Sequence, residues 1–410
     1  MNLKIIVKDT NLPFSITERK GVGHPDTLCD ATAEYVSQKY SQYCLKNFGE
    51  VLHHNCDKFA ILGGTAEVGF GYGRVTKPFK FIMNGRFSES FGLVKIDYKN
   101  LVRQWIKEYI SSVLTTINPE TDIEIIDMIH SNPSPGVINS DIANLPPRSS
   151  IFMFAPRDRN DLTQSTFLES NDTSAGVGYA PYSISDRVAI GIENRLNSKD
   201  FKIEHPYVGS DIKVMVATID QSIEITTCIP FIGKFTPTIE FYKEKIKELK
   251  DIISHETLEL VGDKYSINIT INNRDVIEMN EVYLTATGSS VESGDEGMVG
   301  RGNRANGVIS MTSPMSMEAA CGKNPIYHIG KLYNVLAGEI ASKIYNLYKI
   351  ACKVYVVSQT GRNLQDPWQC IVVLDSEKYD EKEVSAVVEK ELLNIGKLSE
   401  DLIFGRRSIF

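Results

Sequence analysis

DIKVMVATIDQSIEITTCIPFIGKFTPTIEFYKEKIKELKDIIS, residues 211–254, shows most clearly how this chain is organised. Two runs rich in β-branched residues, 211–219 and 222–229, follow one another and predict two strands. The segment 238–254 then repeats its apolar residues with the period of a helix. Strands that occur two or more together between helices favour α+β layers with mixed sheets over a doubly wound parallel sheet.

The same alternation extends outward along the chain. Further helices are predicted at 28–47, 98–115, 183–196, 330–350 and 380–394. Further strands are predicted at 58–64, 80–83, 123–127, 150–154, 265–272, 280–287, 353–359 and 370–375. Loops are expected at 63–74, 131–141, 169–181 and 292–307. No fixed-period repeat and no low-complexity linker divides the chain.

Composition limits the class of protein. The 410 residues, 42% hydrophobic and 23% charged, are enough for two or three lobes with cores of their own. The 44 basic and 52 acidic residues give a net charge of −8 without a basic run, so nucleic acid and anionic membranes are not expected as partners. No uncharged apolar run is long enough to span a bilayer, and we expect a cytoplasmic protein. The cysteines are scattered without a Cys-x-x-Cys pair, which fits a reducing compartment: Cys29, Cys44, Cys56, Cys228, Cys321, Cys352 and Cys370.

The stretch KGVGHPDTLCD, residues 20–30, predicts a helix start with chemistry at its tip. Pro25 suits the first helical position, which leaves His24 just outside the helix. The N-terminus of a helix is the positive end of its dipole and attracts an anion. The Asp26 carboxylate would repel that anion unless a cation such as Mg²⁺ lies between the two. We therefore predict a polyphosphate and Mg²⁺ site, in which Gly21 and Gly23 let the backbone approach the ligand. The alternative is an ordinary capped surface helix.

The segment ESGDEGMVGRGNRANG, residues 292–307, offers an acid, two arginines and several glycines in one irregular loop. Asp295 and Arg301 are six residues apart and can converge only if the loop folds back on itself. An arginine fork on a phosphate, and a carboxylate on a metal or a ligand amine, are the natural assignments. The loop matches neither a P-loop nor a dinucleotide-binding fingerprint. A flexible surface loop is the alternative.

Three further residues are weaker candidates. Lys323 follows Gly322 in a predicted turn, Asp172 precedes two glycines, and Lys213 opens a strand. Each has an ordinary explanation, as a solvated lysine, a turn aspartate and an edge-strand charge respectively.

Taken in order, these segments resemble the methionine adenosyltransferases, also called S-adenosylmethionine synthetases, of the archaeal type. The likeness extends over essentially the whole chain and rests on ERKGVGHPD, NDTSAGVGYAP, GDEGMVGRGNRANG and SMEAACGKNPIYHIGKLYN, at 18–26, 171–181, 294–307 and 316–334. The resemblance implies that methionine sulfur attacks C5′ of ATP, and that the expelled triphosphate is hydrolysed to pyrophosphate and phosphate.

The resemblance also implies roles for individual residues. His24, Lys213, Arg301 and Lys323 would be the catalytic groups that help the triphosphate leave, and Asp26 would bind Mg²⁺. ATP and methionine would be bound by Asp172, Asp295, Arg301 and Lys323.

Several positions depart from the common form of the family. Thr27 and Gly302 stand where lysines are expected, and Asn324 stands where an aspartate is expected. The family's second metal-binding aspartate has no counterpart, which leaves Glu318 and His328 as candidates for a second Mg²⁺. Asp57 and Glu67 are candidates for the K⁺ and methionine sites.

The family fold implies three similar lobes around a pseudo-threefold axis, with interdigitated segments, and a homodimer whose active sites lie between subunits. The lobes are expected at 1–22 plus 183–290, 23–155 plus 291–330, and 156–182 plus 331–410. Two alternatives stay open. One is a relative that uses another thioether or only hydrolyses polyphosphate, and the other is a catalytically silent nucleotide-binding protein.

Overall fold

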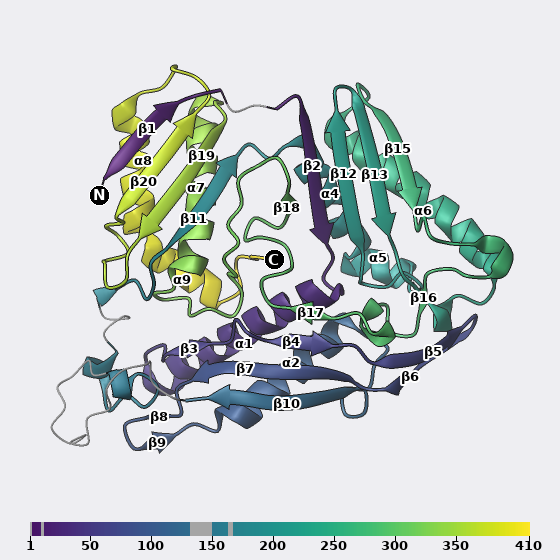
Figure 1. Ribbon diagram of the computed structural model, residues 1–410, viewed down its shortest axis with the longest axis horizontal. Coiled ribbons are helices and arrows are strands. Elements are labelled where there is room, and N and C mark those ends of the chain that lie inside the picture. Colours follow the sequence, from purple (N-terminus) through teal and green to yellow (C-terminus); the bar gives the residue numbers. More distant parts are fainter. Residues whose placement is uncertain (1, 10–11, 132–149, 163–166) are drawn as a thin grey trace.

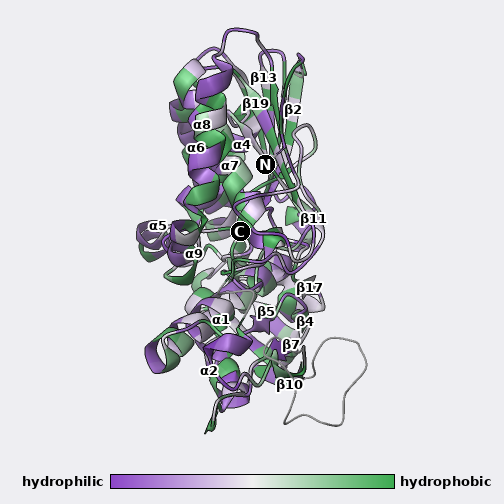
Figure 2. Ribbon diagram, turned by 90° about the vertical axis from the view of Figure 1, so that its left-hand side faces the viewer, coloured by the Kyte–Doolittle hydropathy of each residue, from purple (hydrophilic) through white to green (hydrophobic). Residues whose placement is uncertain are grey.

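The computed structural model describes residues 2–9, 12–131, 150–162 and 167–410. Three mixed sheets occupy separate regions of the molecule (Figure 1). In the view of Figure 2 the helices lie on one side and the strands on the other. The α+β class with mixed sheets is therefore confirmed.

The sheet predicted from residues 211–229 has the strand order β15-β13-β12-β2-β18. Its strands are β2 (Phe14–Lys20), β12 (Lys213–Ile219), β13 (Ser222–Cys228), β15 (Ser266–Ile271) and β18 (Ile309–Ser310). β12 pairs antiparallel with both β13 and β2, and Lys213 lies opposite Lys20. Lys213 therefore opens a central strand, and its explanation as an edge-strand charge is wrong.

The sheet next to the chain ends has the order β1-β20-β19-β11. It consists of β1 (Leu3–Val7), β11 (Ser174–Ala180), β19 (Cys352–Ser358) and β20 (Gln369–Leu374). β1 pairs with β20, so residues 3–7 do not join β2 as the expected 1–22 segment implies. Residues 3–7 form an edge strand whose partner is more than 360 residues away, which local sequence does not reveal. The remaining lobe boundaries stay a prediction.

The third sheet has the order β10-β7-β4-β17, with β3 also paired to β7. It consists of β3 (His54–Asn55), β4 (Ala60–Leu62), β7 (Phe79–Phe87), β10 (Ile123–His130) and β17 (Gly297–Met298). β17 belongs to the glycine loop, so the loop is attached to a sheet formed early in the sequence.

Each sheet shares an apolar core with its own helices. Alternate residues of the strands point into these cores, as in β19, where Val354 and Val356 are buried and their neighbours are half-buried. The helices are α1 (Pro25–Phe48), α2 (Tyr98–Val113), α4 (Ile184–Leu196), α5 (Lys199–Glu204), α6 (Ile239–Val261), α7 (Ile329–Tyr348), α8 (Glu381–Leu393) and α9 (Ile395–Ile403). All six predicted helices are confirmed. Among the described residues, none of the helices combines the length and the apolar composition that a membrane span requires.

Some local predictions are wrong. Residues 63–74, expected as a loop, form most of the hairpin of β5 (Thr65–Gly69) and β6 (Tyr72–Lys77), and most of 169–181 is β11. In place of the strand expected at 150–154, Ser150–Phe152 form a 3-10 turn. The alternating Phe152 and Phe154 are both buried, so the apolar pattern reflects burial rather than strand pairing among the described residues. The loop expected at 131–141 falls outside the described residues apart from Ser131. Short pairs are formed by β8 (Ser90–Phe91) with β9 (Val94–Lys95), and β14 (Phe231–Ile232) with β16 (Leu284–Thr285).

Candidate active site

The start of α1 has the predicted geometry. His24 is the N-cap residue and Pro25 occupies the first turn. The Asp26 N–H donates to His24 Nδ1 at 3.2 Å, so Nδ1 is the acceptor nitrogen of the ring. Nε2 then carries the proton and can donate it, or a hydrogen bond, to a ligand at the helix tip.

The glycines before His24 have a packing role in the fold. A Cβ on Gly21 would lie 2.6 Å from Ile212 O, and one on Gly23 would lie 2.6 Å from the Ser210 carbonyl carbon. The prediction that these glycines let the backbone approach a ligand stays a prediction. They let segment 210–212 pass against the helix start, which brings the beginning of β12 to the site.

Charged side chains from β2 and β12 surround this helix start. Lys20 Nζ donates to Asp26 Oδ2 at 2.8 Å, and Lys213 Nζ lies 3.3 Å from Glu18 Oε2. Glu18 and Lys20 share one face of β2 because side chains alternate along a strand. Neither was predicted, although Glu18 stands six residues and Lys20 four residues before His24.

The glycine loop closes the other side of the cluster. Asp26 Oδ1 accepts from the Met298 N–H at 3.1 Å and lies 3.7 Å from Arg301 Nε. Gly297 packs directly against the backbone of Pro25, where no side chain would fit. The predicted convergence of Asp26 with the loop of residues 292–307 is confirmed. We call Glu18, Lys20, His24, Asp26, Lys213 and Arg301 the helix-start cluster.

Asp211 and Asp295 lie at the edge of this cluster. Asp211 is buried and accepts from the Ser290 N–H at 2.9 Å, and the Ser290 hydroxyl lies 3.0 Å from Asp295 Oδ2. Burial raises the pKa of Asp211, and the nearby His24 and the Ser290 hydrogen bonds oppose that rise. Asp211 was not predicted, although it stands two residues before Lys213.

Asp30, one turn beyond Asp26 on α1, holds the loop from beneath. Its carboxylate accepts from the Gly300 N–H at 2.7 Å and the Gly302 N–H at 3.0 Å. Burial raises the pKa of Asp30 to about 7, and the Gly300 N–H and Arg304 act in the opposite direction. A Cβ on Gly302 would collide with this carboxylate, which explains why no lysine stands at that position.

Lys323 belongs to a second group of charges, which contacts α1 further along the helix. Its side chain is 3% exposed, forms an ion pair with Glu318 and lies 3.8 Å from Asp57 Oδ2. Burial lowers the pKa of Lys323 to about 8, while Asp57 and Asp172 oppose the shift electrostatically. The explanation of Lys323 as a solvated lysine is wrong. We call Lys323, Asp57, Glu318 and Asp172 the Lys323 cluster.

The two clusters are joined by α1. The Lys323 carbonyl accepts from Ser37 Oγ at 3.2 Å, and the Gly322 N–H donates to Glu34 Oε2 at 3.1 Å. Asp26 and Glu34 are eight residues apart, so the contacts lie roughly 12 Å apart along the helix at 1.5 Å per residue. Glu67 belongs to neither cluster, because it pairs with Arg74 on the β5–β6 hairpin.

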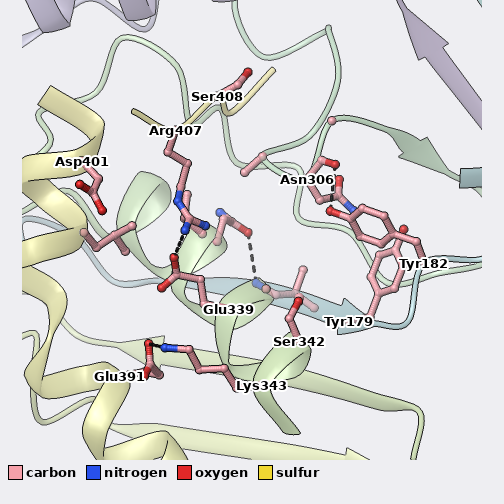
Figure 3. Close-up of a pocket in the computed structure, with 18 of the residues that line it drawn as sticks. Tyr179, Tyr182, Asn306, Glu339, Ser342, Lys343, Glu391, Asp401, Arg407 and Ser408 are labelled. Carbon is pink, nitrogen blue, oxygen red and sulfur yellow. Dashed lines mark hydrogen bonds and ion pairs between the residues drawn. The ribbon is translucent and has the colours of Figure 1, made fainter. Parts of the chain in front are cut away.

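A cavity of about 730 Å³ lies on the other face of β2, between α4, α7 and α9 (Figure 3). Arg19 lines it, as do Asn306 and Gly307 at the end of the glycine loop. On its wall Lys343 pairs with Glu391 at 2.5 Å. None of the predicted site residues lines this cavity, so the predicted chemistry lies elsewhere.

Comparison with known proteins assigns the chain to a family. The sequence pattern of the S-adenosylmethionine synthetases (AdoMet synthetases) matches residues 5–142 and 153–406. This chain belongs to the S-adenosylmethionine synthetase family. Similar relatives include the S-adenosylmethionine synthase of Hyperthermus butylicus, which is 36% identical over 96% of this chain and 95% of its own length. The probable S-adenosylmethionine synthase of Aquifex aeolicus is 37% identical over 92% and 90%.

A solved structure agrees with the fold. The structure described as an unusual S-adenosylmethionine synthetase from Campylobacter jejuni superposes with a TM-score of 0.58, covering 94% of this chain and 90% of that one. At 14% identity this likeness concerns the fold alone. The family membership makes the chain a methionine adenosyltransferase, an enzyme of S-adenosylmethionine synthesis.

S-adenosylmethionine synthetases use divalent metal ions, and the donor set here can be tested against that need. Across the described part of the chain, no three His, Cys, Asp or Glu side chains gather closely enough to hold a metal by themselves. Mg²⁺ is usually held by one or two carboxylates together with substrate phosphates. Asp26, with Glu18 close by, fits that second arrangement, since each carboxylate oxygen can accept more than one partner.

The candidates for a second metal fit less well. His328 is the N-cap of α7, and its Nδ1 accepts from the Gly330 N–H at 3.3 Å. Burial lowers the pKa of His328, which favours the neutral ring that metals bind, but Nδ1 is already occupied by this hydrogen bond. Glu318 is already paired with Lys323.

Proposed function

We propose that this enzyme transfers the adenosyl group of ATP to L-methionine, with S–C5′ bond formation and C5′–O bond cleavage in one step. The sulfur lone pair forms the sulfonium bond, and the electron pair of the broken bond leaves on the triphosphate. Water then cleaves the triphosphate to pyrophosphate and phosphate. A neutral thioether nucleophile needs no general base, so catalysis consists of alignment and of stabilising charge on the leaving group.

The observation that carries the proposal is the convergence of His24, Asp26 and Arg301 at the positive end of α1. The His24 side chain is 14% exposed and that of Arg301 is 71% exposed, so both groups are available to a ligand. In the proposal, Nε2 of His24 donates to the oxygen that leaves C5′, while Arg301 and Lys213 contact phosphate oxygens. Lys20, already paired with Asp26, adds a further cation.

Asp26 is the proposed Mg²⁺ ligand. When bound, Mg²⁺ neutralises charge on the phosphate oxygens. We propose two such ions, with Glu318 and His328 as the candidates for the second, and K⁺ as a further activating ion. Asp295 and Asp172 are proposed to hold the methionine ammonium or to organise the cations, because both carry carboxylates beside the two cation groups.

Lys323 is proposed to act on the triphosphate from the second cluster. In the proposed homodimer the sites lie between subunits, so the two clusters of one chain need not face the same ligand. Half-buried apolar side chains on the outer face of β19 and β20 are compatible with such an interface: Tyr355, Val357, Ile371 and Val373.

One assay tests the proposal. Purified protein is supplied with ATP, methionine, Mg²⁺ and K⁺, and S-adenosylmethionine, pyrophosphate and phosphate are followed together. We expect the three products in equal amounts. Phosphate without the sulfonium product would favour a polyphosphate hydrolase, and binding of ATP without any product would favour a silent nucleotide-binding protein.

A further inference from the structure

Three acids of α1 lie one turn apart on a single face of the helix. Asp26, Asp30 and Glu34 follow an i, i+4, i+8 spacing, and all three are at least 95% buried. Buried carboxylates are costly unless they are hydrogen-bonded or paired. The partners of these three therefore indicate what the stripe of acids does.

Asp30 binds the backbone on both sides of Arg301. Its two oxygens accept from the N–H groups of Gly300 and Gly302, the residues that flank Arg301. From the opposite direction, Arg304 Nη2 donates to the carbonyls of the same two glycines, at 2.6 Å each. Both flanking residues are thus held through their N–H and their C=O.

The backbone of Arg301 itself is also fixed. Its N–H donates to Met298 O at 3.2 Å, and its carbonyl accepts from Lys20 Nζ at 2.9 Å. The side chain is mostly exposed. A rigid backbone therefore presents a guanidinium that is free to contact a ligand.

Glu34, one turn after Asp30, holds the backbone next to Lys323. It accepts from the N–H of Gly322, directly before Lys323, and is paired with Lys331 at 2.7 Å. Ser37, also on α1, donates to the Lys323 carbonyl. Arg301 and Lys323, two of the predicted catalytic cations, thus both have their backbone held by side chains of α1.

We propose that Asp30 and Glu34 are positioning residues, which hold the backbone of Arg301 and of Lys323 respectively in the geometry that the reaction uses. The proposal rests on the proposed function. Neither acid touches substrate in it, and each acts only through the cation that it seats.

Isosteric amides test the two contacts. In Asp30→Asn one carboxylate oxygen becomes an NH₂ group, which faces an N–H donor instead of accepting from it. We expect kcat/KM to fall about 10- to 100-fold, as is typical when a partner that orients a reacting group is lost. Glu34→Gln should produce a loss of similar size.

Double-mutant cycles show whether these losses pass through the cations. In an Arg301→Ala background, Asp30→Asn should cost less than about threefold, because the group it positions is gone. Glu34→Gln should likewise cost little in a Lys323→Met background. In the crossed pairs, Asp30→Asn with Lys323→Met and Glu34→Gln with Arg301→Ala, the fold-losses in kcat/KM of the two single variants should multiply.

Glu391→Gln is the matched control. Glu391 is another buried acid paired with a lysine, Lys343, on the wall of the cavity in Figure 3 and away from both cations. The fold-loss in kcat/KM caused by Glu391→Gln should be the same in the Arg301→Ala and Lys323→Met backgrounds as in the wild type. If Asp30→Asn costs as much in the Arg301→Ala background as in the wild type, the positioning role is overturned.

A second measurement does not depend on catalysis. Amide hydrogen exchange of the free protein should rise at 298–304 in Asp30→Asn and at 320–324 in Glu34→Gln, without a rise at the other segment. Unchanged exchange in the targeted segment overturns the proposal even if the wild type proves inactive. Gly302→Ala, which breaks the same contact from the loop side, replaces Asp30→Asn in both measurements if that variant does not fold.

Discussion

Arg301 and Lys323 are both cations of the proposed site, yet 71% of the Arg301 side chain is exposed and only 3% of the Lys323 side chain. The helix-start cluster keeps its arginine in water, so its charge is permanent and available to an anion. The Lys323 cluster buries its lysine among carboxylates, so its charge depends on burial, on pH and on its neighbours. One helix therefore supports two kinds of cation, an exposed arginine and a buried lysine, which separate experiments can distinguish.

The largest effect is expected from His24→Asn in the helix-start cluster. Asparagine is a good N-cap residue, so the variant keeps the hydrogen bond from the Asp26 N–H but loses the Nε2 donor. We expect kcat to fall by roughly 100- to 10,000-fold, the usual contribution of a positioned proton donor, with a much smaller change in ATP affinity. Steady-state kinetics and calorimetric ATP binding measure the two quantities. An unchanged kcat would remove His24 from the chemistry.

Lys323 should produce an alkaline limb in the activity profile. Because its pKa is lowered to about 8, it loses its charge as the pH rises through that value. We expect log kcat/KM to fall by about one per pH unit above pH 8, and we expect Lys323→Arg to abolish this limb because arginine stays charged. Lys343→Arg is the control that should retain it.

A loss of stability caused by titration of Lys323 cannot explain the alkaline fall in activity. In the unfolded chain a lysine titrates near pH 10.4, so the native state binds fewer protons between about pH 8 and pH 10. The contribution of Lys323 to the free energy of unfolding therefore rises over this window. A thermal melt at each pH separates the two effects.

Asp30 should produce a smaller, acidic limb. Its pKa is raised to about 7, so the carboxylate protonates as the pH falls through that value and one oxygen can no longer accept a glycine N–H. We expect kcat/KM to decrease below pH 7 in the wild type by no more than about the loss caused by Asp30→Asn, which should itself lack the limb. Arg304 and Asp26 face Asp30 and act on its pKa in opposite directions.

The contribution of Asp30 to the free energy of unfolding changes with pH in the direction opposite to the activity. A raised carboxyl pKa means that the native state binds more protons than the unfolded chain between about pH 4 and pH 7, so the free energy of unfolding contributed by Asp30 falls as the pH rises. An acidic limb that persists in Asp30→Asn would have to come from another group.

The smallest effect is expected from Asp57→Asn. The Asp57 carboxylate favours the charged form of Lys323, so its removal should lower the lysine pKa and move the alkaline limb down by about one unit. Glu67→Gln is the control, since Glu67 pairs with Arg74 and should leave the limb in place. A limb that stays at pH 8 in Asp57→Asn would mean that other neighbours set the charge of Lys323.

The sequence predicted the α+β class, the six longer helices and the meeting of Asp26 with the glycine loop. These features follow from local period, from the proline at a helix start and from specific motifs. The sequence did not predict the two acids that hold the backbone of Arg301 and Lys323. Asp30 and Glu34 were visible as acids four and eight residues after Asp26, but only the packing of α1 against distant loops shows that they are buried.

Strand pairing sets the other limit. Glu18 and Lys20 belong to the site because β2 pairs with β12 in one particular register, and a shift of one residue would have turned both away. Similarly, β1 pairs with a strand near the end of the chain. Such pairings are long-range choices that a single sequence records only as apolar runs of similar appearance.

The acids of α1 also have a consequence for synthesis of the chain. Asp30 and its partner Gly302 are 272 residues apart, so at about 5–20 residues per second the helix waits roughly 15–50 s for its loop on the ribosome. During that time a face of α1 that is later buried carries three ionised carboxylates in water. Those charges help to keep this face of the nascent helix in water, and they discourage it from packing against any partner that lacks matching N–H groups and cations.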